Sequence, residues 1–129
     1  MREETVWARA RRLLKRDMMP ETVIEIAQME GIVSVKEATA DIDRVAQIRA
    51  GVQDDFRILS GDDGTTCPFV LLGGDGVISV TSNLVPAEMV AMVHAASSGD
   101  VTTARNHHDA LRPLFEALFI ESNPILREA

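Results

Sequence analysis

Lys36 is the residue of this sequence whose side chain could perform the most distinctive chemistry. It directly follows the β-branched run Ile32–Val35, and lysine is rarely buried without a reason. A lysine held in an apolar pocket loses part of its affinity for a proton, and the neutral amine can attack a ketone and form a Schiff base. The more ordinary alternative is a strand-end lysine that reaches solvent or pairs with Glu37, Asp62 or Asp63. The residue pattern alone leaves both interpretations open.

Polar residues also follow the next two apolar runs. Ser60 and Gly61 come after the first of these runs, and Thr81 comes after the second. The carboxyl ends of parallel strands lie at the same edge of a sheet, where α/β folds bind ligands. We therefore expect Lys36, Ser60, Gly61 and Thr81 to share one neighbourhood.

The elements that position these residues alternate between two periods. Short β-branched runs predict strands, and apolar residues at three- and four-residue steps predict helices. The strands are expected at 32–36, 56–60 and 76–80, and the helices at 20–28, 41–50 and 65–72. This alternation indicates βα units with right-handed crossovers and a parallel sheet, which is an α/β fold.

Two longer helices are expected after the third strand. The first begins at Pro86, and its predicted core face carries Met89, Val90, Val93 and Ala96. Asp100 is the expected N-cap of the second. The apolar face of that last helix is formed by Ala104, His108, Leu111, Leu114, Phe115 and Leu118. In the earlier helix expected at 41–50, the residues that share one face are Ile42, Val45, Ala46 and Arg49.

The charge of the chain is unevenly distributed. Its 129 residues carry a formal net charge of −7, which argues against a nucleic-acid partner, because such binding requires a basic surface. Residues 1–16 reverse this balance, with six basic and two acidic side chains. We expect a basic helix over 1–16 and a main domain over 17–129.

The number of cysteines and the length of the apolar runs indicate the cellular compartment of the protein. The one cysteine, Cys67, lies in an apolar stretch and cannot form an internal disulfide, so a buried, reduced thiol is expected. No apolar run approaches the roughly 18 residues of a membrane span. These features predict a cytoplasmic protein that does not associate with membranes.

Three further motifs admit both a ligand-binding and a structural interpretation. Asp62–Asp63 could bind a metal or cap the following helix. The neighbouring residues His107 and His108 diverge by about 100° on a helix, so core or interface packing of His108 is favoured over metal binding. Gly73–Gly76 precedes a strand rather than a helix, which favours a turn with positive φ over a phosphate cradle. No metal and no cofactor are expected.

Four ordered blocks of the sequence resemble the C-terminal half of the dihydrodipicolinate synthase family, which belongs to the pyruvate-dependent class I aldolases. These blocks are Ile32–Thr39, Leu59–Asp63, Gly73–Asn83 and Glu121–Pro124. The resemblance implies a partial TIM barrel. Its three parallel βα units would be the sixth to eighth of the family barrel, followed by C-terminal helices.

The resemblance also implies an activity. The family comprises lyases that condense pyruvate with aspartate semialdehyde through a lysine Schiff base in lysine biosynthesis. Lys36 matches the Schiff-base lysine, Gly61 lies in the loop that lines the pocket, and the backbone of Ile78 matches the group that places the pyruvate-derived part. The implied partners are pyruvate, an aldehyde substrate, and either further copies of the chain or another chain.

The sequence departs from the family pattern in several places. The first five strands, the Gly-x-x-Gly carboxylate-binding segment and the proton-relaying tyrosine have no counterpart, and the chain contains no tyrosine. Ala40 stands where the family usually has glycine. The alternative function is therefore a catalytically inactive, truncated fragment of the family that persists as a remnant or associates with another chain.

Overall fold

A computed structural model describes residues 18–120. Its elements, in chain order, are α2 (Pro20–Ala27), β1 (Ser34–Glu37), α3 (Asp43–Arg49), β2 (Arg57–Ser60), α4 (Thr66–Leu71), β3 (Gly76–Val77), the 3₁₀ turn η1 (Thr81–Asn83), α5 (Pro86–Ser97) and α6 (Val101–Leu118). The basic helix expected over 1–16 and the Glu121–Pro124 block lie outside the described residues.

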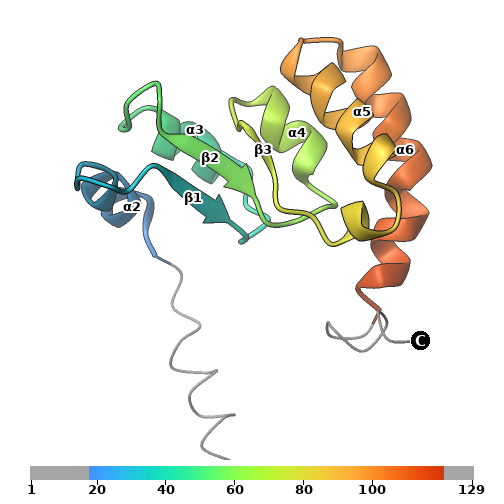
Figure 1. The fold of residues 1–129 in the computed structure, drawn as a ribbon, viewed down its shortest axis with the longest axis horizontal. Coiled ribbons are helices and arrows are strands. Elements are labelled where there is room, and N and C mark those ends of the chain that lie inside the picture. Colours follow the sequence, from blue (N-terminus) through green and yellow to red (C-terminus); the bar gives the residue numbers. More distant parts are fainter. Residues whose placement is uncertain (1–17, 121–129) are drawn as a thin grey trace, which may run out of the picture.

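The three strands form one parallel sheet in the order β1-β2-β3 (Figure 1). Lys36 of β1 lies opposite Leu59 of β2, which in turn lies opposite Gly76 of β3. A helix lies between each pair of consecutive strands, as parallel pairing requires. The α/β class and the parallel sheet predicted from the sequence are confirmed.

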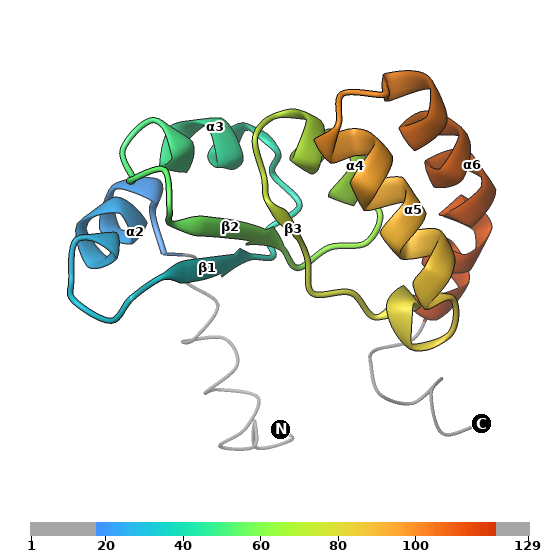
Figure 2. The same cartoon turned by 45° about the horizontal axis from the view of Figure 1, so that its top comes forward.

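Helices cover one face of this sheet. Figure 2 shows α3 on one side of β1 and β2, with no described helix on the opposite side. The core lies on the covered side, where Val45 and Ile48 of α3 pack with Ile58 of β2, all fully buried. Ala46, expected on the core face of α3, is exposed, because the buried face is formed by Val45 and Ile48 and Ala46 points away from it.

The third strand is shorter than predicted. Extended pairing with β2 ends at Ile78, whose backbone N–H donates to the last carbonyl of β2 at 2.8 Å. The carboxylate of Asp63 then accepts hydrogen bonds from the backbone N–H groups of Val80 (3.1 Å) and Thr81 (2.8 Å). These bonds hold the chain in a turn where the apolar run alone predicts further strand.

The two C-terminal helices form a pair beyond β3 (Figure 1). The Asp100 carboxylate accepts from the backbone N–H of Thr103 at 3.0 Å, which confirms the predicted N-cap of α6. The buried residues of α6 are Ala104, Leu111, Phe115 and Leu118. No helix between residues 18 and 120 has the length and apolar content that a membrane crossing requires.

The core face of α5 differs from the predicted one. Its buried residues are Met89, Met92, Ala95 and Ala96. Val90, expected in the core, is 67% exposed. The sequence prediction was wrong by about one position around the helix, because α5 is apolar on two sides and its spacing alone does not select the one that packs on α6.

Ala40 occupies a strained backbone conformation. Its φ is +63°, in the left-handed region that costs an L-residue about 1–2 kcal/mol. Ala40→Gly removes this strain, and the greater freedom of glycine in the unfolded chain offsets part of the gain. We predict that the variant unfolds at a higher urea concentration, with a gain of about 0.5–1 kcal/mol.

Ala50 provides the matched control, because it caps α3 with an ordinary φ of −65°. Ala50→Gly has no strain to relieve and should lose about 0.5–1 kcal/mol. Equal effects of the two substitutions on the urea midpoint would contradict the strain assigned to Ala40.

Candidate active site

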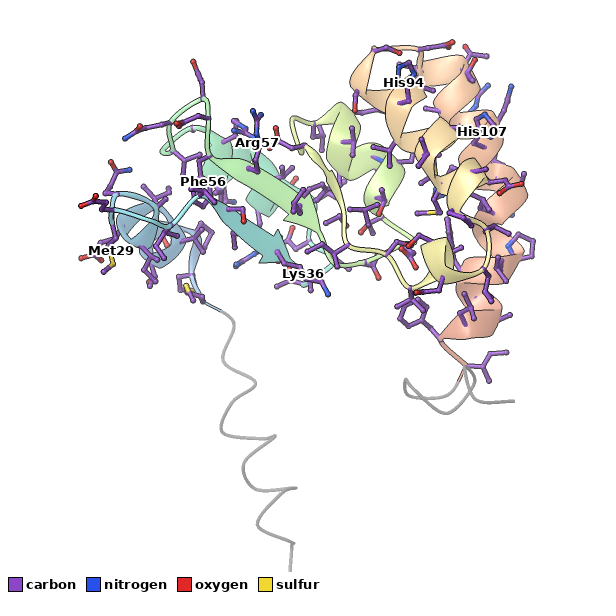
Figure 3. The ribbon with its side chains drawn as sticks, in the orientation of Figure 1. Met29, Lys36, Phe56, Arg57, His94 and His107 are labelled. Carbon is purple, nitrogen blue, oxygen red and sulfur yellow. The ribbon has the colours of Figure 1, made fainter. Side chains whose placement is uncertain are left out.

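Lys36 lies on the uncovered face of the sheet. Successive side chains of a strand point to opposite faces, so Lys36 and the next residue, Glu37, diverge. Glu37 is buried on the helical side, whereas Lys36 is exposed at the carboxyl end of β1 (Figure 3). Lys36 borders a cavity of about 230 Å³ that Val23, Val35 and Arg44 also line, but its side chain stays exposed because the described residues place no second layer on this face.

Gly61 lies against the side chain of Lys36. A Cβ atom built on Gly61 would lie 2.7 Å from Cε of Lys36 and 2.6 Å from Cβ of Ala38, closer than real side chains approach. The backbone N–H of Gly61 also donates to the carbonyl of Glu37 at 2.7 Å, which continues the β1–β2 pairing. The absence of a side chain at Gly61 therefore leaves the space that Lys36 occupies.

Ile78 lies at the carboxyl end of the opposite outer strand. Its backbone N–H donates to the carbonyl of Ser60 at 2.8 Å, and its side chain is 49% exposed. Because β2 lies between β1 and β3, the backbone of Ile78 and the side chain of Lys36 stand on either side of the Ser60–Gly61 strand end.

The other two members of the expected neighbourhood are turned away from Lys36. Ser60 is buried on the helical side, and its hydroxyl donates to the carbonyl of Asp62 at 2.9 Å. Thr81 is fully buried, and its hydroxyl donates to the carboxylate of Asp63 at 2.8 Å. Both hydroxyls hold turns in place. The structure thus brings Lys36 together with Gly61 and not with Ser60 or Thr81.

Asp62 and Asp63 have structural partners. Asp62 accepts from the backbone N–H (2.9 Å) and the hydroxyl (2.7 Å) of Thr65, so it holds the turn that leads into α4 and does not form the predicted cap of the helix itself. Asp63 is buried, and its Oδ2 binds the η1 turn, a role the sequence analysis missed. Within residues 18–120, no group of three or more potential ligands from His, Cys, Asp and Glu is placed to hold a metal.

The remaining motifs also have structural roles. The ring of His108 packs against Phe115 with centroids 5.8 Å apart, and Gly73 has a φ of +108°. Cys67 is buried and unpaired by any disulfide. Burial raises the pKa of its thiol, and the nearby carboxylate of Asp109 adds to this. The predicted turn at Gly73 and the buried thiol are confirmed, whereas His108 is half-buried and lies outside the core.

A buried ion pair anchors the strand that carries Lys36. Nε of Arg44 lies 2.8 Å from Oε2 of Glu37, and both side chains are nearly inaccessible. The backbone N–H of Thr39 donates to the other carboxylate oxygen at 2.9 Å. Sequence analysis missed this pair, although strand alternation, which separates Glu37 from Lys36, and the basic residue in the next helix were available signals.

The sequence model of the Dihydrodipicolinate synthetase family matches residues 11–128, so it covers the strand ends at Lys36, Gly61 and Ile78. The chain belongs to this family. Among curated members, 4-hydroxy-tetrahydrodipicolinate synthase of Psychromonas ingrahamii is 50% identical over 109 residues, which are 84% of this chain and 37% of the relative. The enzyme of that name from Methanosarcina mazei is 48% identical over 110 residues, 84% of this chain and 38% of the relative.

Solved structures of the family have the same arrangement of elements. Dihydrodipicolinate synthase from Aquifex aeolicus matches with a TM-score of 0.81 and 42% identity, over 84% of this chain and 38% of that one. The lysine-bound enzyme from Cyanidioschyzon merolae matches with a TM-score of 0.80 and 40% identity, over 84% of this chain and 37% of that one. The chain therefore spans little more than a third of the length of these family members.

The Glu37–Arg44 pair predicts a pH-dependent stability. Burial opposes ionisation of Glu37, but the hydrogen bonds from Thr39 and Arg44 outweigh it and hold the pKa of the carboxyl below its ordinary value of 4.5. Arg44→Ala leaves this charge buried without its partner, which costs about 3 kcal/mol at pH 7. Because a lowered pKa stabilises the fold above the unfolded-state value, the difference between variant and parent should shrink as the pH falls below about 4.5.

Arg57→Ala is the matched control, because the Arg57 side chain is 59% exposed in its pair with Asp75 at 3.0 Å (Figure 3). An exposed pair contributes about 1 kcal/mol or less. Urea unfolding of both variants from pH 7 to pH 3 makes the comparison. A loss for Arg44→Ala that stays constant over this range would contradict the role given to the pair.

Proposed function

We propose that this chain carries the imine-forming lysine of a 4-hydroxy-tetrahydrodipicolinate synthase, a lyase of lysine biosynthesis, and that its strands are the sixth to eighth of a TIM barrel. The observation that carries the proposal is the position of Lys36 in a member of this family. It lies at the carboxyl end of a parallel strand, with its side chain against Gly61. This is the edge at which barrel enzymes carry their chemistry.

The reaction we propose begins with the amine of Lys36 and pyruvate. The lone pair of the neutral amine attacks the keto carbon, and the keto oxygen leaves as water when the carbon–nitrogen double bond forms. Loss of a proton from the pyruvate methyl group then gives an enamine. The enamine carbon bonds to the aldehyde carbon of aspartate semialdehyde, whose oxygen takes up a proton.

The neighbours of Lys36 have supporting roles in this proposal. Gly61 keeps the path of the lysine side chain free, because any side chain there would overlap Cε of Lys36. The backbone of Ile78, at the end of β3, helps place the pyruvate-derived group. No metal or cofactor is required in this scheme, because the protonated imine formed by Lys36 withdraws electrons from the pyruvate methyl group.

Proton transfer in this proposal depends on a group outside these 129 residues. The chain contains no tyrosine, so the proton relay implied by the family resemblance must come from elsewhere. Losing general acid–base assistance typically lowers a rate by 10²–10⁴-fold. The second candidate function, a catalytically inactive fragment that associates with another chain, is favoured by the exposed position of Lys36. We place the protein in the cytoplasm in either case.

Reductive trapping tests the proposed role of Lys36. The chain contains two lysines, Lys15 and Lys36, so each is an internal control for the other. Pyruvate followed by borohydride reduces any imine to a stable secondary amine, and peptide mass spectrometry then finds the modified residue. We predict modification of Lys36 in large excess over Lys15. Equal modification of both lysines, or none, would remove the catalytic proposal and leave the inactive fragment.

A pair of glycine variants refines this experiment. Gly61→Ala forces the Lys36 side chain from its position and also shifts the backbone, because the new Cβ would lie 2.6 Å from Cβ of Ala38. The distorted lysine rotamer alone costs about 0.5–1.5 kcal/mol, so trapping should slow by about tenfold or more. Gly64→Ala is the control, because its added Cβ would meet only Oδ2 of Asp62, at an ordinary 3.6 Å. Equal trapping rates in the two variants would show that Gly61 does not support the reaction of Lys36.

A further inference from the structure

A buried carboxylate joins the two loops that border the candidate site. Asp63 lies in the loop after β2 that also carries Gly61, and the residue is only 1% exposed. Its Oδ2 accepts three hydrogen bonds from the segment that follows β3. The donors are the backbone N–H of Val80 (3.1 Å), the backbone N–H of Thr81 (2.8 Å) and the hydroxyl of Thr81 (2.8 Å). One oxygen therefore holds the segment after β3 against the loop after β2.

These bonds fix the backbone beside Ile78. The N–H of Ile78 donates to the carbonyl of Ser60 at 2.8 Å, so the carbonyl of Ile78 is the backbone group that it can offer to a ligand. That carbonyl belongs to the peptide unit between Ile78 and Ser79. The Ser60 carbonyl holds the chain before this unit, and Asp63 holds it after the unit, at Val80. The orientation of the Ile78 carbonyl is therefore set from both ends.

The loop that carries Asp63 also sets the path of the lysine side chain. Gly61 leaves the space that Lys36 occupies, since a Cβ atom at Gly61 would lie 2.7 Å from Cε of Lys36. Asp63, two residues further along the same loop, holds the backbone next to Ile78. Residues 60–63 thus determine where the amine lies relative to the Ile78 carbonyl.

The charge of Asp63 is unusual for a side chain that only holds a turn. Among residues 18–120, the ion pairs involve Glu37 and Asp75 but not Asp63. Within the same residues, Oδ1 of Asp63 is buried without a hydrogen-bond partner. A buried, unpaired charge opposes folding, and proteins retain such groups mainly where function requires them. A carboxylate oxygen is also a stronger acceptor than a neutral one, so it can hold three donors in one geometry.

We propose that Asp63 is a positioning residue for the reaction of Lys36 with pyruvate. By holding the backbone at Val80 and Thr81, it fixes the Ile78 carbonyl at the distance from the amine that the pyruvate-derived group requires. Asp63 acts through this backbone and does not touch the substrate. The inference rests on the proposed function, since it assigns a further residue to the same reaction.

Pyruvate titration with borohydride trapping tests this proposal on the full chain. The amount of modified Lys36 after a fixed time gives the pyruvate concentration at half-saturation. Asp63→Ala removes all three bonds to the segment, and we expect the half-saturating concentration to rise about threefold to tenfold, the effect of one misplaced hydrogen bond to a ligand. Asp63→Asn keeps one oxygen for the three donors, so the rise should be about twofold or less.

Asp75→Ala is the matched control. Asp75 also joins β2 to β3, because its Oδ2 accepts from the backbone N–H of Ile58 at 2.8 Å. It lies at the amino ends of these strands, whereas Lys36 lies at a carboxyl end. We expect Asp75→Ala to lower the urea midpoint and to leave the half-saturating pyruvate concentration of the folded protein unchanged. If Asp63→Ala does not fold, Thr81→Val replaces it, since this change removes only the hydroxyl donor and should also raise that concentration.

Each outcome decides the proposal. A rise with Asp63→Ala or Thr81→Val that is absent with Asp75→Ala supports it. Equal half-saturating concentrations in Asp63→Ala and Asp75→Ala, with the imine present in the parent, would overturn this inference and leave the proposed function in place. Equal rises with Asp63→Asn and Asp63→Ala would assign the effect to charge rather than to the hydrogen bonds, and would also overturn it. A parent chain that forms no imine at Lys36 would remove the proposed function, and this inference with it.

Discussion

The arrangement of the candidate site depends on the parallel pairing of β1 with β2. This register sets Lys36 beside Leu59 and brings the Gly61 backbone to the carbonyl of Glu37. A shift of one residue would turn Lys36 toward the helices and Glu37 toward the open face. The pairing is fixed on its buried side by Ile58 and by the Glu37–Arg44 ion pair, so the core that stabilises the sheet also determines which face carries the amine.

Sequence patterns predicted the order of elements and the parallel sheet, because β-branched runs and helical spacing are local signals. They placed Lys36 and Gly61 together for the same reason, since both follow strands that end at one edge. They did not predict the orientation of Ser60 and Thr81, whose hydroxyls are held by Asp62 and Asp63 in turns. The first bond lies within one turn and the second joins turns that are distant in sequence, and neither leaves a periodic signal.

The solvent exposure of the Lys36 side chain could not be predicted from the sequence for a different reason. A pocket around an amine requires atoms on both sides of it, and the described residues provide one layer. The same missing layer accounts for the exposed face of α5, where the sequence predicted a core position for Val90. Both observations have one cause: the residues are suited to a sheet covered on both faces, and the described residues cover one face.

Nuclear Overhauser spectroscopy on the isotopically labelled full chain tests the central claim most directly. The packing of the Lys36 side chain on the Gly61 backbone predicts strong cross-peaks between the ε-methylene protons of Lys36 and the α-protons of Gly61. It also predicts cross-strand contacts in the register that pairs Lys36 with Leu59. If these cross-peaks are absent while those of the buried Ile58 core are present, the lysine does not lie at this strand end as described, and the account of the site is contradicted.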